Sequence, residues 1–215
     1  MAQLFRHYKG KFYLLHKKVL HSETLESLVY YESLYENEKG KHWVRPEAMF
    51  YEQVEVNGVK QLRFAPVEPE YKITEKLTEE EKNQVVQFFK TQEIFPEFEE
   101  KKFLYQLEIK SRLLFVIAYF EEQLIGIKIG YLLSPYKFYS WMGGVAPQFR
   151  RGGIAKKMMT LQHQWCRQQK VILIETRTKN SFLEMISLNL KSGFQIVGTK
   201  IDKKGETKIL LEKKL

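Results

Sequence analysis

The chain has 215 residues, 44% of them hydrophobic and 28% charged, which suits one large or two small globular domains that bury a core. A single cysteine, Cys166, excludes an internal disulfide and a cysteine-rich metal cluster, and it favours a reducing, cytoplasmic setting. Charges interrupt the N-terminus, and the longest apolar runs are too short to cross a bilayer, so we expect neither a secreted protein nor a membrane partner.

The formal net charge of +9 is concentrated in the C-terminal half. Residues 1–68 carry a net charge of +1, residues 69–100 carry −5, and residues 101–215 carry +13. Such a basic half favours a polyanionic partner, which is either a nucleic acid or a phosphate-bearing cofactor.

The first third of the chain predicts a small, mostly β domain over residues 1–66. Short segments rich in Tyr, Phe and Val alternate with turn residues, among them the Asn57-Gly58 pair that is typical of tight hairpins. Two prolines and alternating charges in residues 64–72 interrupt the apolar pattern and mark the boundary with a second domain over residues 67–215. The expected strands are 11–21, 27–35, 47–56 and 61–64.

The second domain predicts helices interleaved with strands. Thr78 followed by three glutamates predicts a helix start, and Gly193 predicts the end of a later helix. One apolar helical face consists of Ile154, Met158, Leu161 and Trp165. The expected order is a helix over 77–92, strands over 112–120, 124–133 and 137–145, a helix over 153–169, a strand over 171–178, a helix over 181–194 and two final strands.

The stretch VAPQFRRGGIAKKMM, residues 145–159, joins an expected strand to an expected helix and has the features of a phosphate-binding turn. Gly152 and Gly153 permit a tight turn and a close backbone approach, and the following helix adds unpaired N–H groups. Arg150 and Arg151 supply charge-assisted donors for phosphate oxygens. The turn therefore favours a bound diphosphate, although it matches neither a nucleotide triphosphatase loop nor a dinucleotide fold.

This turn and its surroundings resemble the GNAT superfamily of acetyl-CoA-dependent N-acyltransferases, over residues 71–213. Residues 150–155 match the family's Arg/Gln-x-x-Gly-x-Gly/Ala motif, and Val145-Ala146-Pro147 match the end of its fourth strand. Asn180 and the Lys-Ser-Gly-Phe turn at 191–194 match its second motif. The resemblance implies an α/β (α+β) fold in which a mixed central sheet is flanked by helices.

The resemblance also implies acetyl-CoA (coenzyme A) as the co-substrate and no metal. In the family the fourth and fifth strands splay apart, and the thioester lies between them. The main-chain N–H near Val145 would polarise the thioester carbonyl, and the backbone of residues 151–155 would hold the diphosphate. The implied cofactor-binding residues are Gly143, Val145, Arg150, Arg151, Gly152, Gly153, Ile154, Ala155 and Asn180.

The expected catalytic groups depart from the family's pattern. Where many members have a tyrosine that protonates the leaving thiolate, this chain has Asn189, whose amide donates a hydrogen bond but is not an acid. The stretch 138–144 also lacks the carboxylate that serves many members as a base through water. Tyr136, Tyr139 and Ser187 are the nearest replacements, and Tyr139, Asn189 and Ser187 are the candidate catalytic residues.

The acidic segment 69–100 supplies the expected acceptor site. In the family the segment that follows this domain boundary forms one wall of the substrate site, and in this chain it includes Glu97, Glu99 and Glu100. An acidic wall attracts a cationic amine. We therefore expect a small-molecule or peptide amine as the acceptor, and a homodimer is left open.

Residues 5–65 resemble a small bacterial domain family of unknown function. The match includes a His-Ser-Glu-Thr turn at 21–24 and a Trp-x-Arg-Pro box at 43–46. The resemblance implies a compact β module with no assigned chemistry. A candidate pocket for a small polar or anionic ligand consists of His21, Glu23, Trp43 and Arg45.

Three functional classes remain open. The first is an N-acetyltransferase, and the second is an acyl-CoA-binding sensor or regulatory protein without turnover. The third is a nucleic-acid-associated protein, which the even spread of Lys and Arg over residues 101–215 disfavours. No metal site is expected, because the spacings of His7, His16, His21 and His42 match no common ligand pattern.

Overall fold

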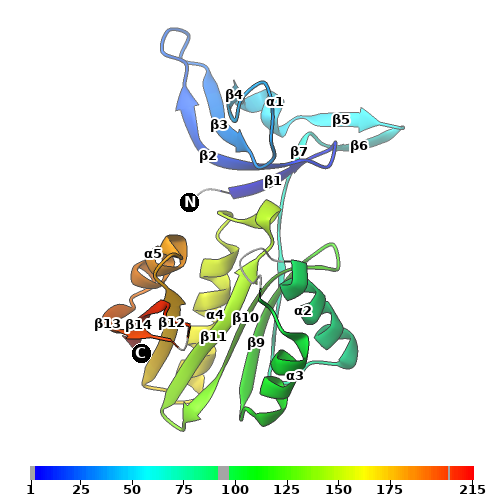
Figure 1. Cartoon of the computed structure of the whole chain (residues 1–215). Coiled ribbons are helices and arrows are strands. Elements are labelled where there is room, and N and C mark those ends of the chain that lie inside the picture. Colours follow the sequence, from blue (N-terminus) through cyan, green and yellow to red (C-terminus); the bar gives the residue numbers. More distant parts are fainter. Residues whose placement is uncertain (1–2, 92–96, 203) are drawn as a thin grey trace. The chain divides into compact units, whose positions relative to one another are not determined.

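The computed structural model describes residues 3–91, 97–202 and 204–215 of the chain (Figure 1). The chain divides into two compact units. The first unit contains Met1–Pro69 and Ala146–Ile154, and the second contains Glu70–Val145 and Ala155–Leu215. The short segment 146–154 therefore belongs to the same compact unit as the N-terminal residues.

A five-stranded antiparallel sheet forms the first unit, in the order β4-β3-β2-β1-β7 (Figure 1). Its strands are β1 (Gln3–His7), β2 (Phe12–Leu20), β3 (Ser27–Ser33), β4 (His42–Pro46) and β7 (Phe64–Pro66). A separate hairpin of β5 (Gln53–Val56) and β6 (Val59–Leu62) closes through Asn57 and Gly58, whose φ angles are 52° and 79°. Two successive positive φ angles confirm the tight turn that the Asn-Gly pair predicts.

The core of the first unit is largely aromatic. Phe5, Val29, Tyr31, Phe50 and Phe64 are buried together, and the rings of Phe50 and Phe64 stack with their centroids 4.2 Å apart. Aromatic pairs add specific ring contacts to the free energy gained by burying their surface. A few large rings therefore give this small sheet its core.

The predicted strand over residues 47–56 is wrong in its first half. This segment begins with helix α1 (Glu47–Tyr51), and only its second half is β5. The helix places Phe50 at the centre of the aromatic core, where none of its surface is exposed. Burial of this ring outweighs the strand preference of the aromatic run around it.

The second unit is a seven-stranded sheet in the order β13-β14-β12-β11-β10-β9-β8, flanked by helices (Figure 1). β11 and β12 run parallel and the other neighbours run antiparallel, which confirms the predicted mixed sheet. The strands are β8 (Glu70–Thr74), β9 (Leu113–Phe120), β10 (Gln123–Ser134), β11 (Lys137–Val145), β12 (Leu173–Lys179), β13 (Gln195–Ile201) and β14 (Thr207–Lys214). The helices are α2 (Glu79–Thr91), α3 (Glu100–Ile109), α4 (Ile154–Gln168) and α5 (Leu183–Lys191).

Two elements of the second unit, β8 and α3, have no counterpart among the sequence predictions. β8 forms the edge of the sheet beside β9. Helix α3 buries only Phe103 among its 10 residues. Its apolar period is therefore too weak to identify a helix from the sequence.

Three of the four residues predicted for the inner face of α4 are buried. Ile154, Met158 and Trp165 are 3%, 1% and 8% exposed, and the fourth, Leu161, is half-buried. The predicted end of α5 is also confirmed, because the chain leaves that helix at Gly193, whose φ angle is 88°. A glycine adopts this left-handed conformation without steric cost.

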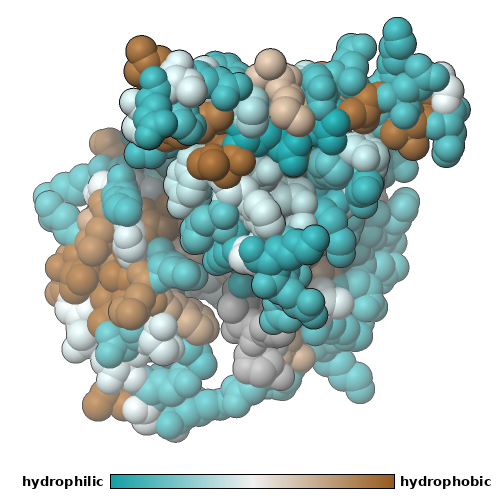
Figure 2. Space-filling model, turned by 90° about the horizontal axis from the view of Figure 1, so that it is seen from above, coloured by the Kyte–Doolittle hydropathy of each residue, from teal (hydrophilic) through white to brown (hydrophobic). Residues whose placement is uncertain are grey.

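Exposed apolar side chains gather over α5 and β13 (Figure 2). β13 is also an edge strand of its sheet. Within the described residues, no helix combines the length and the apolar character that a membrane span needs. The exposed apolar residues of this surface are Leu183, Leu190, Ile196, Val197 and Ile201.

The start of α2 is stabilised by two reciprocal hydrogen bonds. The Glu81 N–H donates to Thr78 Oγ1 at 3.2 Å, and the Thr78 N–H donates to Glu81 Oε2 at 2.9 Å. This arrangement is a capping box, which satisfies two backbone donors at a helix start.

We expect Thr78→Ala to lower the free energy of unfolding by about 1 kcal/mol, because one backbone donor loses its acceptor. Urea unfolding measures this change. Thr160→Ala is the matched control, because the Thr160 hydroxyl only donates back to the carbonyl of Lys156 within α4. The control should be neutral or slightly stabilising. Equal losses in the two variants would contradict the capping role.

Candidate functional site

The parallel pairing of β11 with β12 stops before either strand ends. Lys137 to Ser140 pair in register with Leu173 to Thr176. β11 then continues to Val145 and β12 continues to Lys179. The two strands therefore share a ladder only over their first residues.

A register shift explains where the pairing ends. In the ladder with β10, Ser140 pairs with Gly130 and Met142 pairs with Ile129, so Trp141 is an extra residue on β11. An extra residue bends the strand that carries it and increases its local twist. At the same position the Thr176 hydroxyl donates to the Ser140 carbonyl at 2.9 Å. This side-chain bond closes the parallel ladder at its last pair.

The strand beyond the shift contains a glycine that the packing requires. Gly143 pairs with Lys128 of β10. A Cβ at position 143 would lie 2.8 Å from the carbonyl oxygen of Ile127, closer than real Cβ contacts allow. A side chain at this position would therefore push β11 away from β10.

The turn after β11 places a bare backbone at the start of α4. A short 3-10 helix, η1 (Pro147–Phe149), leads into it. Arg151 and Gly153 have φ angles of 66° and 84°, so the backbone alternates into the left-handed region. A Cβ at Gly153 would meet no atom within 4 Å, which leaves the approach to its backbone open. Successive N–H groups in such turns form anion-binding concavities.

The charges around the turn also suit an anion. The first turn of α4 contains no acidic residue, in contrast to the first turn of α2, which contains three. The positive end of the α4 dipole is therefore not offset by its own side chains. Lys156 and Lys157 on this first turn are exposed. The predicted diphosphate-binding residues thus stand on one continuous strand, turn and helix, and their chemistry fits a phosphate group.

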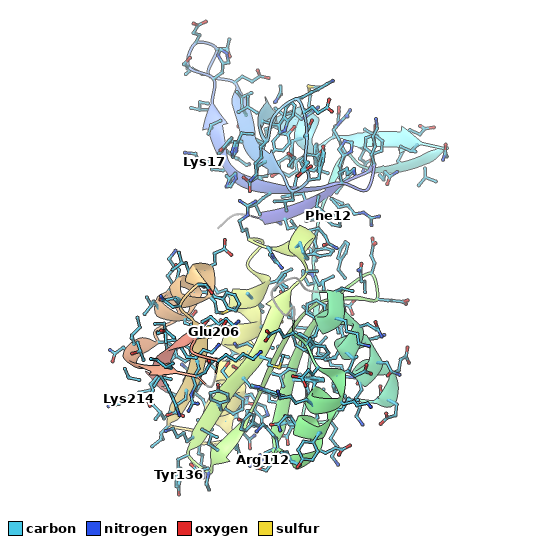
Figure 3. All side chains as sticks on the ribbon, viewed as in Figure 1. Phe12, Lys17, Arg112, Tyr136, Glu206 and Lys214 are labelled. Carbon is cyan, nitrogen blue, oxygen red and sulfur yellow. The ribbon has the colours of Figure 1, made fainter. Side chains whose placement is uncertain are left out.

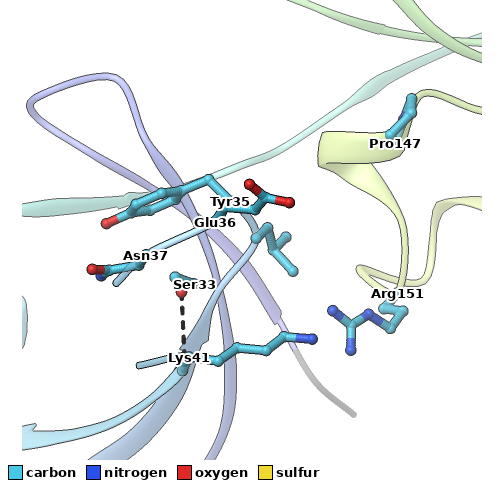
Figure 4. Close-up of a pocket in the computed structure, with 8 residues that line it drawn as sticks. Ser33, Tyr35, Glu36, Asn37, Lys41, Pro147 and Arg151 are labelled. Carbon is cyan, nitrogen blue, oxygen red and sulfur yellow. Dashed lines mark hydrogen bonds between the residues drawn. The ribbon is translucent and has the colours of Figure 1, made fainter. Parts of the chain in front are cut away.

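Arg151 is already engaged with a carboxylate of its own unit. Its guanidinium Nη2 lies 2.6 Å from Oε1 of Glu32, whose side chain is only 3% exposed. Arg151 also lines an open pocket of about 340 Å³ in the first unit (Figure 4). The residues that line this pocket are Ser33, Leu34, Tyr35, Glu36, Asn37, Lys41, Pro147 and Arg151.

Of the candidate catalytic residues, Tyr139 is half-buried on β11. Its ring lies 5.5 Å from that of Tyr131, and the Arg177 guanidinium lies 5.7 Å from it. Burial raises the pKa of Tyr139 above its usual value, and the Arg177 charge partly opposes this. Tyr139 therefore stays protonated near neutral pH.

The other candidate residues lie on α5 and in the turn between β10 and β11. Asn189 is 3% exposed, and its carbonyl accepts the N–H groups of Ser192 and Phe194 at the helix end. Ser187 is half-buried on the same helix. Tyr136 lies at the other end of β11 from Val145, in the turn after β10 (Figure 3).

Family models match most of the chain. The model of the acetyltransferase (GNAT) family matches residues 77–194. The chain belongs to the GNAT acetyltransferase family. The model of a protein of unknown function (DUF1653) matches residues 3–66, so both sequence resemblances are confirmed. No curated protein matches the chain significantly.

Solved structures show the same fold. Ard1 from Thermoplasma volcanium has a TM-score of 0.56 and 16% identity, with 67% of this chain and 97% of that chain covered. The ribosomal-protein-S18-alanine N-acetyltransferase from Escherichia coli has a TM-score of 0.58 and 15% identity, with 67% and 94% covered. PaiA N-acetyltransferase from Thermoplasma acidophilum, solved in complex with coenzyme A, has a TM-score of 0.52 and 14% identity, with 68% and 99% covered.

The second GNAT motif lies where β12 ends. Asn180 directly follows β12 and is exposed, and its N–H donates to the carbonyl of Thr207 at 3.2 Å.

Each predicted acceptor residue forms an ion pair with a lysine: Glu97 with Lys204, Glu99 with Lys102 and Glu100 with Lys90. This segment of the GNAT unit therefore presents mixed rather than purely negative charge.

A polar cluster between β10 and α4 is missing from the sequence predictions: Lys128 is half-buried on β10, and His163 and Cys166 are buried on α4. Burial lowers the pKa of Lys128 to about 8 and that of His163 to about 3, and it raises the pKa of the Cys166 thiol to about 12. His163 Nδ1 lies 3.2 Å from the Lys213 amine. The one signal in the sequence is a lysine inside the apolar run of residues 124–133. The high thiol pKa agrees with a structural role for Cys166.

Lys128 should make stability depend on alkaline pH. Its pKa in the folded chain is about 8, below the ordinary 10.5, because burial disfavours the charged amine. The unfolded chain therefore binds more protons between these pH values, and stability rises with pH across that window. Below pH 8 the buried charge of Lys128 lowers the free energy of unfolding by ~3 kcal/mol, since one pKa unit corresponds to about 1.4 kcal/mol.

We expect Lys128→Met to raise the free energy of unfolding at pH 7.5 and to flatten its rise between pH 8 and 10.5. Urea unfolding at several pH values measures both effects. Lys200→Met on the exposed face of β13 is the control. A wild-type profile that is already flat in this window would contradict the burial of the Lys128 charge.

Proposed function

We propose that this chain transfers an acetyl group from acetyl-CoA to an amine. The observation that carries the proposal is the early end of the β11–β12 ladder at Ser140, followed by the glycine turn and the α4 start, in a member of the GNAT family. Coenzyme A is bound in the related PaiA N-acetyltransferase structure, and alanine is the acceptor named for the E. coli relative.

In this proposal the strand, turn and helix hold the coenzyme. The diphosphate binds the backbone N–H groups of residues 151–155, with charge-assisted hydrogen bonds from Arg150 and Arg151. The pantetheine arm extends along Gly143 to Val145, and Asn180 contributes beyond β12. To bind phosphate directly, Arg151 turns from Glu32, which its exposed position permits.

The reaction is a direct displacement. A neutral amine attacks the thioester carbonyl, so a C–N bond forms, the C–S bond breaks and the thiolate leaves. A main-chain N–H near Val145 stabilises the negative charge that develops on the carbonyl oxygen. The amine proton passes to water, and the thiolate takes a proton from Tyr139 or from water, because the amide of Asn189 is not an acid. Ser187 is the second candidate for proton transfer, and positioning of the two reactants supplies much of the rate.

The proposed domain arrangement follows the sequence boundary. Residues 67–215 carry the transferase, and residues 1–66 form a separate module. The acceptor is a small-molecule or peptide amine held near Glu97, Glu99 and Glu100. No nucleic acid is required, because the basic residues have a role around a phosphate-bearing co-substrate.

We expect Gly153→Glu to weaken coenzyme A binding at least about tenfold. A glutamate at this position forces a side chain into a backbone conformation with φ 84° and adds a negative charge beside the diphosphate. Isothermal titration with coenzyme A measures the change. Gly205→Glu is the matched control, because Gly205 also has a positive φ, 79°, and open space around it, but lies in the β13–β14 turn.

Equal coenzyme A affinity in wild type and Gly153→Glu would overturn the proposed site. Thiol release from acetyl-CoA with a panel of amines then separates a transferase from a binding protein without turnover. Binding to polynucleotides that weakens steeply with salt, in the absence of coenzyme A binding, would instead favour the nucleic-acid class.

We expect the triple substitution Glu97→Gln, Glu99→Gln and Glu100→Gln to raise the KM for cationic amines about tenfold, with little change in the KM for acetyl-CoA. Each substitution also leaves a partner lysine without its carboxylate, which adds to the repulsion. Steady-state kinetics at low salt measure both constants. A control with Glu121→Gln and Glu122→Gln changes charge in the β9–β10 turn. An unchanged KM for the amine would exclude Glu97, Glu99 and Glu100 from the acceptor site.

A further inference from the structure

Three strands of the first unit bring two imidazoles and a carboxylate together. Glu32 of β3 pairs directly with His42 of β4, so their side chains share one face of the sheet. Oε2 of Glu32 lies 3.6 Å from His16 Nε2 and 3.9 Å from His42 Nδ1. All three candidate ligand atoms lie within 4.8 Å of one another.

His16 reaches this cluster through an irregularity in β2. Leu15 pairs with Tyr31, and Lys17 pairs with Tyr30, so His16 is an extra residue between them. Extra residues of this kind redirect side chains and recur beside functional sites. The His16 imidazole stacks on the Tyr30 ring at 5.0 Å, which holds it over the strand.

Two buried polar atoms of this cluster, His16 Nε2 and Glu32 Oε1, have no hydrogen-bond partner among the described residues. Glu32 is 2% exposed. Arg151 approaches Oε1 of Glu32 at 2.6 Å but directs no N–H at it, and it leaves Oε2 to the two imidazoles. A buried ring nitrogen without a hydrogen bond is costly, and so is a buried carboxylate oxygen that only ion pairs approach.

We propose that His16, Glu32 and His42 bind a divalent transition metal ion of the zinc class. Imidazole nitrogen and carboxylate oxygen lie ~2.0–2.2 Å from such an ion, which places ligand atoms of a tetrahedral site roughly 3.3–3.5 Å apart. The observed 3.6 Å and 3.9 Å need only small movements of side chains. Imidazole donors favour zinc over magnesium or calcium.

The cluster leaves one coordination position open. Two histidines and one carboxylate supply three ligands, and the fourth position of a tetrahedral ion is left to water. The Tyr30 hydroxyl lies 2.9 Å from His42 Nδ1 and gives up this bond when the ion takes the nitrogen. The spacing of residues 16, 32 and 42 matches no local motif, because each ligand comes from a different strand.

The test uses the full chain, stripped of metal with a chelator and titrated with Zn²⁺ or Co²⁺ alone. We expect one equivalent to bind, with a visible Co²⁺ absorption band typical of a tetrahedral site and a higher thermal midpoint. His42→Asn should weaken binding at least about tenfold, since even the loss of a residue that supports a ligand costs that much. His42 is exposed, so the variant should fold.

His21→Asn is the matched control, because His21 lies in the same unit outside the cluster and its Nδ1 accepts backbone N–H groups of its own turn. It should bind Zn²⁺ as wild type does. His16→Asn gives a second test if His42→Asn proves unstable. Zn²⁺ binding that is absent in wild type, or equal in wild type and the cluster variants, would overturn the proposal. Neither result depends on coenzyme A binding.

Discussion

The end of the parallel ladder at Ser140 and Thr176 is the constraint on which the candidate site depends. If β11 and β12 stayed paired, their facing backbone N–H and C=O groups would bond to each other and would not be available to a ligand. Because Trp141 is an extra residue in β11, that strand bends at the point where its pairing with β12 ends. The same strand must stay close to β10, which requires glycine at position 143. One inserted residue and one missing side chain therefore define how β11 leads into the turn.

Much of this architecture could be predicted because it depends on local signals. The capping box of Thr78, the left-handed Gly193 and the apolar face of α4 are each written within a few neighbouring residues. Helices α1 and α3 could not be predicted from the sequence, because no local signal marks them. Phe50 is helical because the aromatic core needs its ring, and α3 buries a single side chain. Tertiary packing determines the secondary structure of these two segments, and the local residue preferences do not predict it.

The polar sites could be predicted only where their residues are neighbours in the sequence. The glycine turn stands in one stretch, so its residues could be named from the sequence. Lys128 and His163 come from β10 and α4, and their pKa values follow from burial that forms only on folding. Glu32 likewise meets His16 and His42 through strand register and an inserted residue. The spacing of these residues in the sequence does not predict that they meet in the fold.

The exposed apolar surface of β13 has a consequence for the behaviour of the protein in solution. An edge strand with free apolar side chains is a template for pairing with another molecule. Lys200 interrupts the run between Val197 and Ile201, and a register shift beside Gly198 distorts the edge. A charge and a distorted edge are devices that keep such strands from pairing edge to edge with another molecule. These two irregularities therefore oppose the pairing of β13 with the same strand of another copy of the chain.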